Sequence, residues 1–434
     1  MPIPSICLDT RLGQFAAAFG AGFSKPQFKY FVIVLLALML CQEPRTLSGL
    51  GRQVSDGPSL SGTSRFLSRA PWSAETLAAD WQTRFRGQMV LPVEAEHRRR
   101  RTARPKGRGR PKATVVTGYL IGDDSTMHKR KAKKMGGLGV HHSTTEGKRV
   151  PGHSLVMGLY VLLGRRCPLQ PMMYRQKRVC QTEGVPFRSK VAIMEEMIRT
   201  FEPVPGTLTH VLLDAWYSAK SIWRVAREQG FLITTGLRNN RSLRIEDPEH
   251  PQGWRWQTLI DYTTGLTAAD YQRVTWPNQT EPRQVYAHLI STRVRKLYRC
   301  QVVIVRDSLD TPLSQARFWA SSDLDADLET LIHHIAARWD IEVLFSDTKG
   351  LLGLDHYQLM SAKAIQRFWT LVMAAYLFLD EERERLCRER QHYVTIGDAR
   401  REIQRLHYHH LIDWIYVQFH TGASPSDLYE RLAV

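Results

Sequence analysis

The sequence predicts an α/β protein in which a mixed sheet carries a β-rich insertion and is preceded and followed by helical segments. Three observations lead to this fold class. Short apolar runs rich in Val, Ile, Leu and Tyr alternate with helical patterns over 114–238. Several β-rich runs follow over 239–324, and helical patterns fill the chain before 97 and after 325. Strands and helices that alternate, interrupted by further strands and closed by a helix, are typical of an open sheet with an insert.

Composition bounds the class of protein. The chain has 434 residues, which predicts two to four structural units, and its 43% apolar content predicts a folded core rather than a disordered or disulfide-dense chain. Lys and Arg exceed Asp and Glu by 60 to 42, a net charge of +18. This excess favours a polyanionic partner, and it favours nucleic acid over an anionic membrane surface. Six cysteines without a C-x2-C pair indicate neither a zinc knuckle nor a disulfide frame, so a reducing, cytoplasmic setting is expected.

The first segment, 1–97, is predicted to be a helical domain, and its short helices with Gly and Ser between them allow a role in binding DNA ends. The apolar run Phe31–Cys41 has 11 residues, too few to span a bilayer as a helix. We therefore expect a buried helix here and no membrane partner.

The basic residues are concentrated in one part of the chain. Between Arg98 and Arg149 there are 16 Lys or Arg and three acids, so +13 of the +18 lies in 52 residues. The segment 98–113 is predicted to be a linker, and PKGRGRPK at 105–112 resembles the AT-hook, in which Arg108 and Arg110 would enter a narrow minor groove. A solvated basic linker explains the same residues equally well.

A second basic block, HKRKAKK at 128–134, follows two adjacent aspartates. A Lys/Arg run is usually a solvated face, but this position next to acids makes Lys129, Arg130 and Lys131 candidate DNA contacts.

Individual elements follow from the same patterns. Strands are predicted at 115–122, 153–164, 209–218 and 231–237, with helices at 190–201 and 219–229 between them. The insertion gives strands at 284–294, 297–307 and 316–322. Trp254 and Trp256 lie in this insertion. We interpret them as the core of a hairpin in preference to aromatic residues that contact a flipped base. A strongly apolar helix is expected at 365–379, and His407, His409 and His410 are placed on a helix surface.

Three carboxylates occupy positions that a mixed sheet would bring together. Asp123 follows an apolar strand, Asp214 ends another, and Glu342 lies on a helix predicted over 331–348. Ligands characteristically bind at this edge of an open α/β sheet. At about 100° per residue, Arg338, Glu342 and Lys349 fall within roughly 40° on one helix face. A surface ion pair worth ~0.3–0.5 kcal/mol is the plain alternative, but it does not explain a stripe of cation, anion and cation.

These motifs resemble those of a known family. The pattern R-x3-E-x6-K at Arg338, Glu342 and Lys349 is similar to the Y-x2-R-x3-E-x6-K signature of insertion-sequence DDE transposases of the cut-and-paste, hairpin-forming type. IGDDST at 121–126 and LLDAWYSAKSIW at 212–223 resemble the segments that carry the family's first and second aspartates. The resemblance covers about 114–380.

The resemblance implies a ribonuclease-H-like catalytic core in two parts, 114–238 and 325–385, separated by the insertion 239–324 and followed by a helical segment 386–434. It implies that Asp123, Asp214 and Glu342 bind two Mg²⁺ ions per active site, with Mn²⁺ as a substitute, and that Arg338 and Lys349 contact DNA phosphates. Its implied partners are double-stranded DNA, as terminal inverted repeats and target, and a second copy of the chain in a synaptic dimer. The setting would be the cytoplasm of a bacterium.

One position departs from the family pattern, and at another the pattern allows two assignments. Ile335 stands where the signature has tyrosine, and its side chain cannot hydrogen-bond a phosphate. The first-aspartate pattern D-x-T/S is satisfied by Asp123 and also by Asp124, of which we prefer Asp123. We expect a DNA transposase that cleaves element ends and joins them to target DNA. A catalytically impaired remnant that only binds or represses DNA is the alternative, and a sequence-unspecific nuclease of the same fold is a third.

Overall fold

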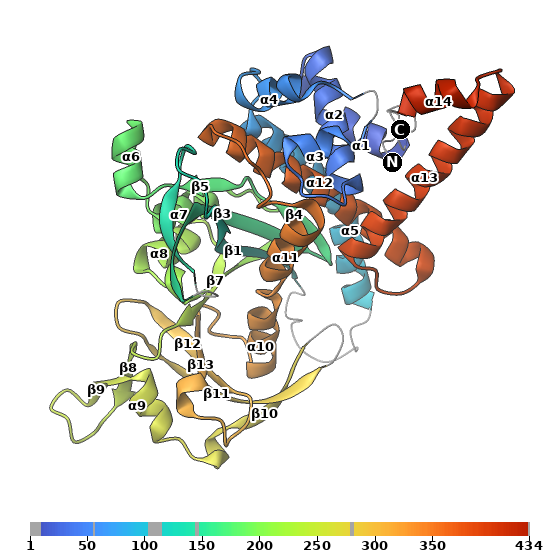
Figure 1. Ribbon diagram of the computed structural model, residues 1–434. Helices are drawn as coiled ribbons and strands as arrows, with labels where there is room; N and C mark the ends of the chain where they lie inside the picture. The colour runs from blue at the N-terminus through green and yellow to red at the C-terminus, as the bar shows by residue number, and fades with distance from the viewer. Residues whose placement is uncertain (1–9, 55–56, 103–114, 144–146, 278–281, 433–434) are drawn as a thin grey trace.

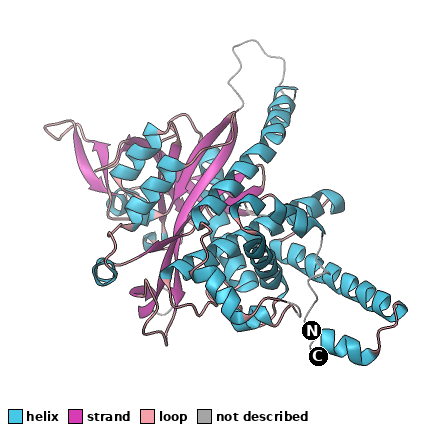
Figure 2. Cartoon of the chain, turned by 90° about the horizontal axis from the view of Figure 1, so that it is seen from above, coloured by secondary structure: helices cyan, strands magenta, loops and turns pink. Residues whose placement is uncertain are grey.

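The computed structural model describes residues 10–54, 57–102, 115–143, 147–277 and 282–432. One large mixed sheet lies at the centre, and helices cover both of its faces (Figures 1 and 2). The predicted α/β class, with helical segments before and after the sheet, is confirmed.

Five strands form the core of the sheet in the order β2-β3-β1-β6-β7. They are β1 Val116–His128, β2 Gly139–Ser143, β3 Lys148–Leu162, β6 Thr207–Leu213 and β7 Leu232–Leu237. β1 runs antiparallel to β3 and parallel to β6, which in turn is parallel to β7. This is a ribonuclease-H-like arrangement. The short strands β4 Arg165–Pro168 and β5 Met172–Tyr174 pair with β3 along the edge that β2 also uses.

β1 is longer than the sequence indicates. The predicted strand ends at Gly122, whereas β1 continues to His128 through the polar residues that follow. Pairing with β3 holds this part, from Asp123 opposite Met157 to His128 opposite Gly152. Both aspartates of the first motif are therefore strand residues.

The insertion extends the same sheet. Its strands β10, β11, β12 and β13 are antiparallel neighbours, and β13 pairs with β7. They span Gln272–Trp276, Arg283–Arg293, Arg299–Arg306 and Arg317–Ser321, while β8 Ser242–Glu246 and β9 Trp254–Thr258 form a separate hairpin that leads into α9 Leu259–Thr264. The expected hairpin at Trp254 and Trp256 is present, but Trp256 is 37% exposed, so its ring is not hairpin core.

Helices occupy both ends of the chain. Those before the sheet are α1 Thr10–Ala17, α2 Lys25–Leu40, α3 Leu47–Gly51, α4 Leu60–Ser68 and α5 Ala74–Thr102. Those between the strands are α6 Lys177–Glu183, α7 Lys190–Thr200 and α8 Lys220–Glu228. Those after the sheet are α10 Leu328–Ala337, α11 Asp340–Leu352, α12 Ala362–Arg390, α13 Ile396–His420 and α14 Pro425–Leu432.

The apolar run in the N-terminal segment is buried, as predicted. Residues Ile33 to Leu40 of α2 are at most 8% exposed, and α2 packs against α12 and α13. The N-terminal helices, the central sheet and α12 share one hydrophobic core. A second core lies between α10 and the insertion strands β10–β12. Over the described ranges, the helices lack the combination of length and apolarity that a bilayer span requires.

Two surface predictions change. Arg98–Arg101 belong to α5, which continues to Thr102, so the predicted linker begins with a helical end. The AT-hook-like stretch with Arg108 and Arg110 lies outside the described residues. His407 is fully buried rather than on a helix surface, because it lies on the side of α13 that faces the core. Its ring Nδ1 donates a hydrogen bond of 2.8 Å to the carbonyl of Ile403.

Candidate active site

Asp123 and Asp214 lie side by side on neighbouring parallel strands. The paired register of β1 and β6 ends with Gly122 opposite Leu213, so Asp123, the next residue of β1, lies beside Asp214, the residue that follows β6. Adjacent strands are about 4.8 Å apart, so the two carboxylates share one end of the sheet. Gly122 permits this close packing, since a Cβ there would lie 2.5 Å from Met194 and 2.6 Å from Leu213.

The Asp214 carboxylate also fixes the turn that follows β6. Its Oδ1 accepts hydrogen bonds from the backbone N–H groups of Trp216 at 3.0 Å and Tyr217 at 3.3 Å. The carboxylate thereby caps the 3-10 turn Ala215–Tyr217, as an N-cap aspartate does. The two backbone N–H groups therefore hold the Asp214 carboxylate in place.

Asp123 and Asp124 point to opposite faces of β1, because side chains alternate along a strand. Asp124 faces α7, where it pairs with Lys190 and accepts a hydrogen bond of 3.0 Å from the Tyr217 hydroxyl. Asp123 faces α11, with its Oδ2 3.6 Å from Arg338 Nη1. Of the two aspartates, Asp123 is the one that shares a face with the helix that carries the glutamate.

The helix predicted over 331–348 is in fact two helices. α10 ends at Ala337 and α11 begins at Asp340, with turn-like bonds from Trp339 N to Ala336 O and from Glu342 N to Trp339 O, both 3.0 Å. The two helices pack on different cores, since α10 contacts β10 and β11 while α11 contacts β1, β3 and α12. The break places Glu342 in the first turn of α11, where the helix dipole favours a carboxylate.

Arg338 lies among the three carboxylates. It donates a hydrogen bond to Glu342 Oε1 and is 3.6 Å from Asp123. Burial raises the pKa of Asp214, and the charge of Arg338 opposes that rise. The Arg338 side chain is 16% exposed, and its guanidinium connects Glu342 to Asp123.

Lys349 is on the same face of β1 as Asp123. Its Nζ donates a hydrogen bond of 2.8 Å to Ser125 Oγ, two residues along the strand. Burial lowers the pKa of this ammonium group. The shared face predicted for Arg338, Glu342 and Lys349 thus points toward β1, although the helix is interrupted.

Burial and mutual repulsion make the aspartates reluctant to ionise. The pKa of Asp123 is raised from 3.8 to about 7, first by burial and then by the neighbouring charge of Asp214. Burial also raises the pKa of Asp214. Carboxylates held together against their own repulsion favour a bound cation, which stabilises their charged forms.

The donor chemistry fits a hard divalent cation, because carboxylate oxygens are the ligands that Mg²⁺ and Mn²⁺ prefer. As placed, however, the His, Cys, Asp and Glu side chains of the described ranges form no group of three or more that is arranged to hold a metal ion. Arg338 stands among the acids instead. Metal binding would require this guanidinium to leave the carboxylates.

The basic residues predicted after β1 have different surroundings. Lys129 donates to the backbone carbonyls of Asp355 at 2.5 Å and Tyr357 at 2.6 Å and lies 3.7 Å from the centre of the Tyr357 ring. Its pKa falls to about 8 because it is buried. Arg130 and Lys131 lie in the exposed turn that follows. Lys129 thus anchors the turn, and the later cations are the ones that face solvent.

Sequence reasoning missed the partners that hold this site. Lys190 and Tyr217 bind Asp124, and Arg166 binds Asp340 at the start of α11 with a distance of 2.8 Å. Tyr217 lies within the second-aspartate motif, so a signal for it existed. Nothing in the residue pattern distinguishes Lys190 or Arg166 from other cations.

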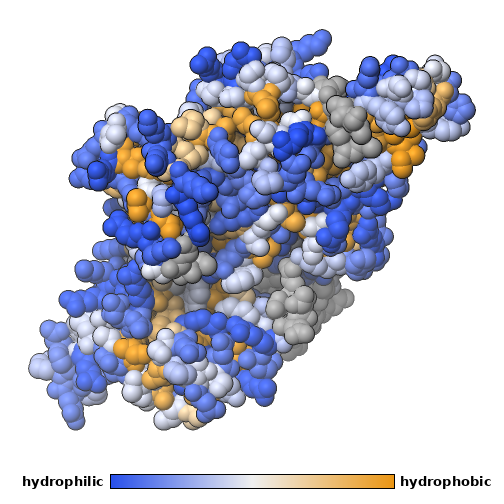
Figure 3. All heavy atoms as spheres, viewed as in Figure 1, coloured by the Kyte–Doolittle hydropathy of each residue, from blue (hydrophilic) through white to orange (hydrophobic). Residues whose placement is uncertain are grey.

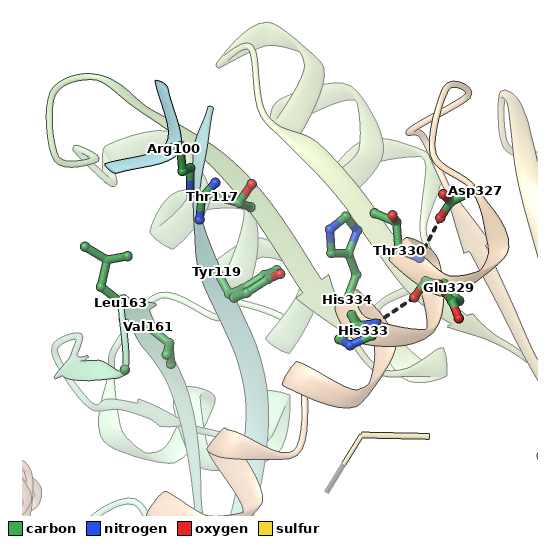
Figure 4. A pocket seen from close by; sticks show the side chains of 11 residues that line it. Arg100, Thr117, Tyr119, Val161, Leu163, Asp327, Glu329, Thr330, His333 and His334 are labelled. Atoms are coloured by element: carbon green, nitrogen blue, oxygen red, sulfur yellow. Dashed lines mark hydrogen bonds between the residues drawn. The ribbon is translucent and has the colours of Figure 1, made fainter. Parts of the chain in front are cut away.

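A pocket of about 520 Å³ lies farther along the same face of β1, toward its start (Figure 4). The residues that line it come from the end of α5, from β1, from the end of β3 and from the start of α10. They are Arg100, Thr117, Tyr119, Val161, Leu163, Gly164, Asp327, Glu329, Thr330, His333 and His334. None of the three candidate carboxylates is among them, so the pocket and the acidic site are separate.

The five-strand core has the ribonuclease-H-like order, and within it Asp123 of β1 lies beside Asp214, which follows β6. Residues 18–295 match the family described as DDE superfamily endonuclease, and the chain belongs to this family. The matched range contains both strand aspartates and ends before Glu342.

Among solved structures, one similar chain is that of the cryo-EM structure of the piggyBac transposase synaptic complex with hairpin DNA. It is 10% identical in sequence, the similarity covers 99% of this chain and 84% of that chain, and the TM-score is 0.44. A search of curated proteins gives no match.

Proposed function

We propose that the chain is a DNA transposase of the insertion-sequence type, in which Asp123, Asp214 and Glu342 are the catalytic carboxylates. The observation that carries the proposal is the meeting of Asp123 on β1 with Asp214 after the adjacent parallel strand β6, with Arg338 linking Asp123 to Glu342. The reaction would begin with a hydrolytic nick at the element end. The released 3′-hydroxyl would then attack the opposite strand, and strand transfer into target DNA would follow.

Two Mg²⁺ ions, or Mn²⁺ in their place, would supply activation of the attacking oxygen and stabilisation of the leaving oxygen. Asp123 and Asp214 would hold the ions from the sheet and Glu342 from the first turn of α11. Arg338 would leave the carboxylates and turn to a DNA phosphate, which offers the same bidentate acceptor geometry. Lys349, held at Ser125, would bind a second phosphate of the same strand.

The partners proposed are duplex DNA, as inverted repeats and target, and a second copy of the chain. The basic turn with Arg130 and Lys131 follows the strand that carries Asp123 and supports a duplex path beside the acidic site. Ile335 does not interfere with this site, because it is 3% exposed and packs with the insertion strands in the second core. Its apolar side chain suits that place.

The test is cleavage of duplexes that carry the DNA flanking the gene, with Mg²⁺ or Mn²⁺. Glu342→Gln and Asp123→Asn should abolish cleavage and leave DNA binding intact, because each removes a metal ligand and no cation. Asp124→Asn should lower the rate of cleavage by only about 10–100-fold, since it disturbs a supporting pair with Lys190.

Glu329→Gln is the matched control, because Glu329 is an exposed acid on the neighbouring helix α10. Cleavage at the wild-type rate by Glu342→Gln would contradict the proposal. Binding without any cleavage by the wild type would instead identify a DNA-binding remnant, and equal cleavage of unrelated duplexes would identify an unspecific nuclease.

A further inference from the structure

The last long helix, α13, carries an apolar stripe that nothing in the described chain covers. Tyr408, Ile412, Tyr416 and Phe419 are 46%, 63%, 63% and 48% exposed. At about 100° per residue these four positions fall within roughly 80° of one another on one side of the helix. We call them the α13 stripe. Four large exposed side chains on one helix side are typical of an interaction surface.

The stripe is separate from the side of α13 that packs on the molecule. Ile403, His407 and Leu411 are buried and face the core. Beyond Leu411 the helix projects from the body of the molecule, and α14 returns beside it, with a hydrogen bond from Arg431 to Gln418 (Figure 1). Apolar residues gather along this projecting end on the visible surface (Figure 3).

Charge restricts what can bind there. From Leu406 to Glu430 the chain contains no Lys or Arg, although its net charge is +18. DNA phosphates and anionic membrane surfaces are recognised by cations, so neither suits this surface. Two copies of so basic a chain repel each other over most of their surfaces. The α13 stripe is a face at which a second copy can approach without opposing cations.

We propose that two copies of the chain associate through the α13 stripe, with the two α13 helices antiparallel. The spacing is self-complementary in that arrangement, since Tyr408 would lie opposite Phe419 of the other copy and Ile412 opposite Tyr416. Such a pairing is isologous and closes after two copies. It names the surface of the dimer in the proposed function, and its role in joining two DNA ends rests on that function.

The stripe sets the expected strength of the dimer. Stable interfaces use about 20–30 residues a side, whereas the α13 stripe has four large side chains with their neighbours on α13 and α14. Association in the micromolar range is therefore expected. Sedimentation of the full chain over about 1–100 µM, without DNA or divalent metal, should show a monomer that converts to a dimer as concentration rises.

The decisive variant is Ile412→Glu, which places two like charges at the centre of the interface. It should weaken dimerisation by at least about tenfold. Leu91→Glu is the matched control, because Leu91 is 70% exposed on another helix, and it should dimerise as the wild type does. Equal melting temperatures will show that both variants fold. A wild type that stays monomeric, or an Ile412→Glu chain that dimerises normally, would overturn the proposal.

Cross-linking tests the antiparallel register. A mixture of Ile412→Cys and Tyr416→Cys chains should give more disulfide-linked dimer than either chain alone, because the two positions oppose each other only when the helices are antiparallel. Self-linking by Ile412→Cys without extra yield in the mixture would indicate parallel helices and overturn the register. These measurements need no DNA cleavage. A monomeric but active enzyme would refute the α13 dimer alone, and an inactive dimer would refute the proposed function alone.

Discussion

Asp123 links the stability of the protein to pH. Its pKa of about 7 lies above the unfolded value of 3.8, so between these values the folded chain holds a proton that the unfolded chain has released. Stability from this group is complete below about pH 4 and is lost as pH rises through about 7. In the Asp123→Asn variant the side chain at this position is neutral at every pH, so the variant does not lose this stability as pH rises. In metal-free buffer, the free energy of unfolding of the wild type should therefore fall relative to that of the variant between pH 4 and 7.

Urea unfolding of both chains at several pH values measures this difference. Saturating Mg²⁺ should reduce it, since a bound cation favours the ionised carboxylate. Parallel stability curves for the two chains would show that Asp123 ionises normally and that its surroundings are more polar than the structure indicates.

At this scale the sequence pattern proposes three acids but gives few of their partners. Helical spacing placed Arg338 and Glu342 on one face, and the ion pair between them follows from that. The approach of Arg338 to Asp123 depends on how α11 lies across β1. The spacing of residues along a helix does not predict how that helix packs on a strand. The preference for Asp123 over Asp124 likewise gains a physical reason only from the alternation of side chains along β1 and from Lys190 on α7.

Among the elements, a buried ionic network positions the start of α11. Asp380 of α12 is fully buried and accepts bonds from the backbone N–H of Arg166 at 3.0 Å and from Arg383 Nε at 2.9 Å. Arg166 in turn binds Asp340, two residues before Glu342. The network therefore ties the glutamate helix to β4 and to α12.

Asp380→Asn should lower the free energy of unfolding by about 3–5 kcal/mol, because it leaves buried arginines without their counter-charge. Chemical denaturation measures the loss. Glu384→Gln, on the same helix but with a side chain 29% exposed, should cost less than about 1 kcal/mol. Similar losses in the two variants would mean that the Asp380 network contributes no more than a surface pair.

The elements differ in how far their residues predict them. The strands at 153–164 and 231–237 are apolar runs, and the sequence places them within a few residues. The break between α10 and α11 is not predictable, because Arg338 and Trp339 are both compatible with a helix and the two helices diverge only to reach separate cores. The second half of β1 is polar, and it is a strand because β3 pairs with it.

For the whole molecule, the order of strands, helices and insertion predicted an α/β sheet with a β-rich insert, and the resemblance to a known family implied the ribonuclease-H-like core. The insertion's attachment was not predicted, since pairing of β13 with β7 joins residues about 80 positions apart. The sequence also did not predict which of the cations face solvent. Arg99 and Arg100 bind Glu96, and the half-buried Lys129 binds backbone carbonyls, so fewer cations face DNA than the net charge implies.

That distribution predicts how DNA binding depends on salt. Lys131, Lys133 and Lys134 are exposed in the turn after β1, and each phosphate that they neutralise contributes about 0.9 to the slope of log affinity against log salt concentration. Replacing all three by Gln should reduce the magnitude of that slope by about 2.7. Fluorescence anisotropy of a labelled duplex at several salt concentrations measures it. Lys129→Gln is the control, and it should lower the melting temperature while leaving the slope nearly unchanged, because Lys129 binds backbone carbonyls. An unchanged slope in the triple variant would move the DNA path away from the turn that follows Asp123.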